Sequence, residues 1–165
     1  MADKDERIVD ELFIAQADKV ERAGGRLLLC QGSDTQGAMA VIRHELASRN
    51  HGARPHYHKG YSEMLYIISG SLAVLGGEEV VVLNEGDLVV VPRFMVHAFS
   101  ATLSSKAEYI LVSTPGTDRF EYFRELDRLR AEGKPSPKSL QNTYDNHNVD
   151  SRIWNDYLVS QGMPL

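Results

Sequence analysis

The chain has 165 residues, 42% of them hydrophobic, and a formal net charge of −5 at pH 7. This length supports one domain with a sizeable core and is short for two. The negative charge and the lack of a dense Lys/Arg run argue against nucleic acid or an anionic membrane as the main partner. We therefore expect a small-molecule partner.

The sequence also bears on the cellular compartment. The first residues, MADKDERIVDEL, are charged, and no segment approaches the ~20 consecutive apolar residues that span a bilayer. The single cysteine, Cys30, cannot form an internal disulfide, which suits a reducing compartment. We expect a soluble cytoplasmic protein, in which Cys30 is an inert thiol buried in a core strand.

Short runs rich in Val, Ile, Leu and Tyr alternate with turn signals between residues 26 and 113, as in an antiparallel sandwich or barrel. An all-β core follows. The segment 48–55, SRNHGARP, is expected to connect two strands. The expected strands are RLLLC (26–30), AMAVIRHEL (38–46), EMLYIIS (63–69), SLAVL (71–75), EVVVL (79–83), DLVVV (87–91), VHAFSA (96–101) and AEYILVS (107–113).

The pattern changes to a helical one near the C-terminus. Phenylalanine and leucine recur every three residues from Phe120 to Leu129, which predicts an amphipathic helix that ends near Gly133, with Asp118 as its cap. Ser136 and Pro137 are candidates for the cap and first residue of a second helix. A third helix is predicted near the end of the chain. Its apolar face, which is expected to pack on the barrel or on a partner chain, would carry Ile153, Trp154, Tyr157 and Leu158.

These patterns divide the chain into an N-terminal arm (1–25), a barrel (26–114) and a C-terminal helical extension (115–165). The arm is compatible with either a helix or an edge strand over residues 7–25.

A candidate metal site lies in HYHKGYSE, residues 56–63. In a strand, His56 and His58 project from the same face, which is a chelating arrangement. Glu63 has the opposite parity, but Gly60 permits a loop or bulge that turns its carboxylate toward the pair. His97 can supply a third imidazole. Such a set of three nitrogens and one oxygen suits one divalent ion of iron, manganese, nickel, cobalt, copper or zinc.

Residues 52–101 resemble the two motifs of the cupin superfamily. The first motif is His-x-His, three or four residues, Glu, six residues, Gly, and it is matched by His56, His58, Glu63 and Gly70. The second motif is matched at Gly86, Pro92 and His97, but Phe94 and Ala101 replace its later glycine and its asparagine. The resemblance implies a single-domain jelly-roll barrel with C-terminal helices and a metal held by His56, His58, Glu63 and His97.

Other polar residues near the motifs have open interpretations. His44 shares strand parity with buried positions, so it is either a contact of the site or a hydrogen-bonded core histidine. Tyr61 either reaches an anionic oxygen at the metal or packs at the rim. Arg54 and Arg93 either attract an acidic substrate or are simply solvated. Solvated surface positions are the better interpretation of two other histidines, His51 and His147.

Open coordination positions on such a metal imply catalysis. The segment STPGTDRFEYFREL resembles the tail of small quercetin-dioxygenase-like cupins, which implies a dioxygenase for a small enol or hydroxylated aromatic substrate, with Glu63 as ligand and base. The alternatives are a non-redox isomerase, cyclase or decarboxylase that uses the metal as a Lewis acid, and a binding module without turnover. Apolar residues that would keep the site dry are Leu65, Ile67, Val90 and Phe99.

We also expect a homodimer. EVVVL and DLVVV are apolar on both faces and need cover beyond one barrel interior, unless the C-terminal helices supply it.

Overall fold

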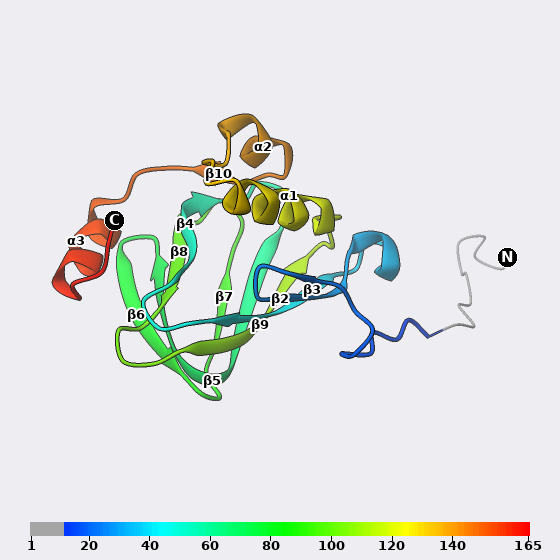
Figure 1. The fold of residues 1–165 in the computed structure, drawn as a ribbon, viewed down its shortest axis with the longest axis horizontal. Helices are drawn as coiled ribbons and strands as arrows, with labels where there is room; N and C mark the ends of the chain where they lie inside the picture. The colour runs from blue at the N-terminus through cyan, green and yellow to red at the C-terminus, as the bar shows by residue number, and fades with distance from the viewer. Residues whose placement is uncertain (1–11) are drawn as a thin grey trace, which may run out of the picture.

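The computed structural model describes residues 12–165, and an antiparallel β-barrel forms its body. Helices α1 (Phe120–Ala131) and α2 (Lys138–Thr143) lie over one end of the barrel, while α3 (Arg152–Ser160) lies at its side (Figure 1). A 3-10 turn, η1, spans Gly32–Thr35. The strands are β1 Arg22–Ala23, β2 Arg26–Cys30, β3 Ala40–Leu46, β4 His51–Tyr57, β5 Ser62–Gly76, β6 Glu79–Asn84, β7 Leu88–Val91, β8 His97–Ala101, β9 Ala107–Thr114 and β10 His147–Asn148.

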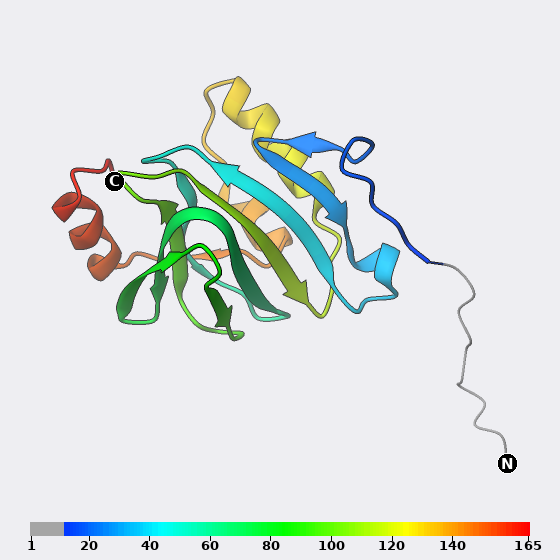
Figure 2. The ribbon, with the colours of Figure 1, turned by 90° about the horizontal axis from the view of Figure 1, so that it is seen from below.

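Strand β5 joins the two sheets of the barrel. Its first half pairs with β7 and β9, and its second half pairs with β6 and β8. Figure 2 shows this strand as a strongly curved arch. Gly70 lies between the two halves with a φ of +77°, a conformation that favours glycine. One strand therefore contributes to both walls of the barrel.

The all-β core predicted from the sequence is confirmed, with two differences. Residues 63–69 and 71–75, expected as separate strands, form the single strand β5, because Gly70 bends the chain without ending its pairing. The expected connector 48–55 was wrong over its second half: residues 51–55 belong to β4, which pairs with β8 through a register shift. Its Gly, Arg and Pro residues concealed a strand that tolerates them because its pairing is irregular.

The three predicted helices are present, with corrected caps at two of them. Asp118 was wrong as the cap of α1: Arg119 is the N-cap, and the Asp118 carboxylate instead accepts the Ser33 amide N–H at 2.8 Å. Pro137 is the N-cap of α2 rather than its first residue. At α3, the Ser151 hydroxyl accepts the Trp154 amide N–H, which satisfies one of the free donors of the first turn.

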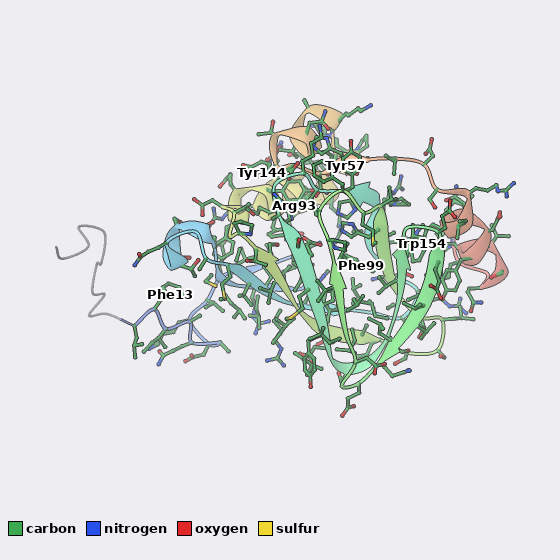
Figure 3. All side chains as sticks on the ribbon, turned by 180° about the vertical axis from the view of Figure 1, so that it is seen from behind. Phe13, Tyr57, Arg93, Phe99, Tyr144 and Trp154 are labelled. Carbon is green, nitrogen blue, oxygen red and sulfur yellow. The ribbon has the colours of Figure 1, made fainter. Side chains whose placement is uncertain are left out.

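Helix α3 packs on the barrel, which was one of the two predicted alternatives for its apolar face. Trp154 and Leu158 are buried in a cluster with Ala73, Leu75 and Ala98 of β5 and β8. Figure 3 shows Trp154 between the helix and the strands.

Cys30 is buried at the end of β2, as predicted, and burial raises the pKa of its thiol. Of the N-terminal segment 7–25, residues 7–11 lie outside the described residues, and the two-residue strand β1 pairs with β2. Within residues 12–165, no helix combines the length and the apolar character needed to cross a membrane.

The bend at Gly70 leads to a test of the barrel. A Cβ atom at Gly70 would lie 1.8 Å from the Lys106 carbonyl oxygen, which is backbone and cannot move aside cheaply. We expect Gly70→Ala to lower the free energy of unfolding by roughly 3 kcal/mol or more. Gly77, with a φ of +62° and open space around it, is the matched control, and Gly77→Ala should cost only about 1 kcal/mol. Urea denaturation measures both, and equal losses would contradict the steric role of Gly70.

Candidate metal centre

The barrel brings the four predicted ligands together. His56 in β4 lies opposite His97 in β8, His58 follows the end of β4, and Glu63 is the second residue of β5. All four side chains are buried, and one potential ligand atom from each lies within 4.8 Å of the others. Two histidines that are two residues apart, a carboxylate beyond the turn and a distant histidine thus form one cluster.

Backbone carbonyls fix the orientation of each imidazole. The Nδ1 atom of His56 lies 2.7 Å from the Arg54 carbonyl oxygen, that of His58 lies 2.7 Å from Asp145 O, and that of His97 lies 3.0 Å from Met95 O. Because a carbonyl oxygen only accepts, Nδ1 carries the hydrogen in all three rings. In the neutral ring, each Nε2 then presents a lone pair, as in histidines that bind a metal.

The three Nε2 atoms and the Glu63 carboxylate converge on one point. The Nε2 atoms of His56 and His58 are 3.1 Å apart, and Glu63 oxygens lie 3.4 Å from His58 Nε2 and 3.3 Å from His97 Nε2. The Nε2 atom of His97 is buried and has no hydrogen-bond partner among the described residues. Such a group of electron pairs is unfavourable unless a cation lies among them. The residues therefore fit a divalent metal ion.

Electrostatics keep the cluster in its ligand forms. Burial alone raises the pKa of Glu63, but His58 and His97 hold it well below its usual range. Burial, together with His97 and His58, lowers the pKa of His56 well below its usual value. Near neutral pH, Glu63 is a carboxylate and His56 a neutral imidazole, which are the forms that bind a metal.

Asp145, in the loop after α2, holds the turn that carries His58. Its carboxylate accepts the amide N–H groups of Lys59 and Gly60 at 2.9 and 2.7 Å, and its carbonyl oxygen accepts Nδ1–H of His58. The carboxylate also lies 2.9 Å from Nε2 of His147. Burial by itself raises the pKa of Asp145, but these hydrogen bonds lower it overall. The C-terminal extension thus positions one ligand.

Arg119 is the second residue that the C-terminal segment adds to the site. Its guanidinium lies 3.4 Å from Glu63 Oε1 and donates hydrogen bonds to the Tyr61 hydroxyl and, at 3.0 Å, to Asn146 Oδ1. The Tyr61 ring stacks on His58, with 4.2 Å between ring centroids. Tyr61 is therefore a packing residue that links Arg119 to the cluster.

A cavity of about 280 Å³ adjoins the cluster and opens between the barrel and the C-terminal helices. His56 and Glu63 form part of its wall. Apolar contacts come from both sheets and from α1. The polar residues along the rest of the wall are Arg26, His44, His51, Arg54, Tyr109, Arg119, Tyr122, Arg130, Gln141, Asn146 and Asn148.

Most of the other sequence candidates are resolved by these positions. His44 lies on the inner face of β3, lines the cavity and has its Nδ1 2.7 Å from the Tyr109 hydroxyl; burial, together with the charge of Arg26, lowers its pKa to about 3. Arg54 is exposed at the cavity, whereas Arg93 does not line it. His51 and His147 are partly buried in short strand segments rather than fully solvated.

The prediction of the apolar wall needs one correction. Leu65, Ile67 and Phe99 are buried as expected, and Figure 3 shows Phe99 inside the barrel. The prediction that Val90 keeps the site dry was wrong, since its side chain is 58% exposed. In the β5–β7 register Glu63 pairs with Val91, so Val91 is the residue of β7 that faces the interior.

The missing glycine of the second motif does not abolish its turn. Phe94 has a φ of +65°, and its amide N–H donates to the His58 carbonyl oxygen at 2.7 Å. The side chain is mostly exposed, so phenylalanine meets no packing conflict in this backbone conformation.

Comparisons with known proteins agree with this description of the fold. Residues 43–113 match the family model described as "Cupin domain". No curated protein matches the chain. Residues 43–113 are therefore similar to a cupin domain, and the barrel has the cupin fold.

Solved structures support the same fold. KdgF from Halomonas sp. has a TM-score of 0.55 at 18% identity, over 64% of this chain and 97% of that protein. A Streptomyces PAC13 variant with uridine has a TM-score of 0.53 at 17% identity, over 66% and 86%. A sugar phosphate isomerase from a cupin superfamily, from Silicibacter pomeroyi, has a TM-score of 0.52 at 20% identity, over 61% and 74%. At these identities the similarity concerns the fold alone.

The cluster predicts its own metal dependence. We expect about one metal ion per chain in the purified protein, because each histidine is oriented to direct Nε2 at the same point. His56→Ala and His97→Ala should each lose most of the metal, as measured by elemental analysis. His51→Ala is the matched control, since His51 lies on β4 outside the cluster. Full metal retention in both ligand variants would refute the assignment.

Proposed function

We propose that the protein is a metal-dependent enzyme that acts on an enol, hydroxyl or carbonyl group of a small molecule. The observation that carries this proposal is the convergence of His56, His58, Glu63 and His97 at the wall of a cavity of about 280 Å³. A purely structural metal site is closed by its ligands, whereas a site beside a cavity leaves room for a substrate.

The residues of the chain would divide the work as follows. His56, His58, His97 and Glu63 hold the ion, and Glu63 also accepts the proton of a substrate hydroxyl, because its carboxylate is ionised and lies at the cavity wall. When bound, the metal polarises a substrate oxygen and, if it is redox-active, supports a reaction with dioxygen. Leu65, Ile67 and Phe99 exclude water from the barrel side of the site.

Oxidative cleavage of an enol or hydroxylated aromatic substrate by dioxygen is the first candidate reaction. The resemblance of the segment 113–126 to the tail of quercetin-dioxygenase-like cupins supports it. In the structure this segment carries Arg119, which contacts Glu63 and lines the cavity, and this position supports a role of the tail in the reaction.

A non-redox isomerisation, cyclisation or decarboxylation is the second candidate, and a specific observation favours it. The guanidinium of Arg119 is buried, remains charged and lies beside Glu63, so it can stabilise an enolate formed by proton removal. Polar walls of this kind are also better suited to a charged substrate than to an extended flavonol.

Reconstitution of the apoprotein tests the two reactions. Separate samples with iron, manganese, nickel, cobalt, copper and zinc are assayed for oxygen uptake with catechols, flavonols and β-diketones. We expect Glu63→Gln to retain part of the metal but to lose turnover by roughly 100-fold or more, because an amide cannot accept the proton. Glu45→Gln, at an exposed position of β3, is the control and should keep full activity.

The outcomes separate the candidates. Turnover under strict anaerobiosis with zinc as effective as iron would replace the dioxygenase by the Lewis-acid enzyme. A Glu63→Gln variant with wild-type turnover would contradict the role of Glu63 as the base.

We further propose that the protein forms a homodimer through β7. Helix α3 covers Val80 of β6, but Leu88 and Val90 of β7 remain 53% and 58% exposed. Their cross-strand neighbours are Tyr66 and Met64, so the outer face of β5 and β7 forms a continuous apolar stripe. Among the described residues, β7 pairs only with β5, and a second copy of this edge strand is a self-complementary partner.

Light scattering at micromolar concentration tests the dimer. We expect the wild-type protein to be dimeric and Leu88→Lys to be largely monomeric, because a charge buried in an apolar interface is unfavourable. Leu103→Lys changes an exposed leucine in the loop between β8 and β9. It is the control and should remain dimeric. A wild-type protein that is monomeric throughout would exclude this interface.

A further inference from the structure

The cavity beside the metal centre has a strong excess of positive charge. Of the residues that the structure describes, four arginines line it, and Glu63 is the only acidic lining residue. Glu63 is also the proposed metal ligand, so its charge is directed to the cluster. The remaining wall is cationic or neutral, and it favours an anionic ligand. The arginines are Arg26, Arg54, Arg119 and Arg130.

The four arginines differ in how far their donors are already used. Arg54 and Arg130 are exposed at the opening of the cavity. Arg119 is buried, but Tyr61, Glu63 and Asn146 accept hydrogen bonds from it. Arg26 is the one buried arginine of the cavity whose guanidinium is largely unused.

Arg26 is the first residue of β2, and only 6% of its surface is exposed. Its single hydrogen bond among the described residues is a long one, from Nη1 to the Gly24 carbonyl oxygen at 3.5 Å. It makes no ion pair with a described carboxylate, although Asp127 of α1 lies in its vicinity. A guanidinium has five N–H donors, so most of its hydrogen-bonding capacity remains free.

The Phe123 ring of α1 holds the guanidinium at the cavity wall. The Arg26 guanidinium carbon lies 5.0 Å from the centroid of this ring, and that of Arg119 lies 5.4 Å from the same centroid. Two guanidinium groups are thus gathered around one aromatic side chain. A buried cation without a counter-ion is costly, and an incoming anion would offset that cost.

We propose that Arg26 binds a carboxylate group of the substrate in this cavity. The planar guanidinium fork matches a carboxylate and can bind it through two parallel hydrogen bonds. Arg54 and Arg130 at the opening favour the entry of an anion. The identity of this carboxylate ligand as the substrate rests on the proposed function, whereas the anion site itself does not.

The size of the cavity limits the ligand further. Its volume of about 280 Å³ is slightly below the ~300 Å³ at which sites for drug-sized ligands begin. The ligand is therefore a small carboxylic acid that carries an enol, hydroxyl or carbonyl group for the metal centre. An extended polycyclic substrate does not fit this description.

Calorimetric titration of the metal-free protein with succinate and malonate tests the site directly. We expect both dicarboxylates to bind the wild-type apoprotein, and Arg26→Met to weaken the binding by about tenfold or more. Arg26→Lys keeps the charge but loses the fork, and it should give a smaller loss. Arg22→Met, at an exposed position of the neighbouring strand β1, is the matched control with unchanged affinity.

The stability of the variants provides a second measurement. Because Arg26 is an unpaired buried cation, Arg26→Met should unfold at the same or a higher urea concentration than the wild type. A purely structural arginine would instead give a destabilised variant with unchanged succinate affinity, and that result would overturn the proposal. If Arg26→Met does not fold, Arg26→Lys decides alone, and a wild-type affinity in it would likewise refute the carboxylate fork.

Two further outcomes complete the test. Binding of inorganic phosphate without any binding of succinate or malonate below about 10 mM would overturn the carboxylate assignment. Loss of succinate binding in Arg26→Met would support the anion site. If the wild-type protein showed no turnover with any of the metals, that result would count against the proposed enzyme. The two proposals can therefore fail separately.

Discussion

The curvature of β5 is the constraint on which the rest of the structure depends. This strand pairs with β7 and β9 before Gly70 and with β6 and β8 after it, so both walls of the barrel meet in one continuous segment. Glu63 lies near its start and pairs with Val91 and Ser113, which directs its carboxylate into the barrel. The left-handed conformation of Gly70 thus bends the same strand that carries, seven residues earlier, Glu63, the only acidic side chain among the described residues that line the cavity.

The burial of that carboxylate explains the residues around it. An isolated buried charge would be very unfavourable, and Glu63 is surrounded by His58, His97 and Arg119. Two of these neighbours are held by groups distant in sequence: Asp145 fixes His58, and Asn146 accepts a hydrogen bond from Arg119. The loop after α2 thus completes a site whose ligands all come from the barrel. Fold and site are coupled because the buried Glu63 carboxylate is surrounded both by residues of the barrel and by Arg119 of the C-terminal extension.

Sequence reasoning could predict the four residues of the cluster because most of their positions follow local rules. His56 and His58 share a strand face, the glycine after them permits the turn, and strand parity correctly placed His44 in the interior. Val90 was misplaced because β7 is short and both of its faces are apolar, so only the pairing with β5 identifies Val91 as the inward residue. Arg26, Arg119 and Asp145 could not be found, since nothing in their local sequence reports contacts formed across 27 to 97 residues.

The distribution of charge connects the metal centre to the cavity. At the cluster, three imidazole nitrogens and one carboxylate are directed at one point, so this part of the cavity wall attracts a cation. Along the remaining wall, arginines without enough carboxylates attract an anion. A small molecule with a carboxylate at one end and an ionisable oxygen at the other satisfies both ends simultaneously. Such a ligand would be held in one orientation, with its reactive oxygen toward Glu63, which is the positioning that proton transfer requires. The specificity of the enzyme would then arise from the spacing between the two charged ends rather than from the shape of an apolar pocket.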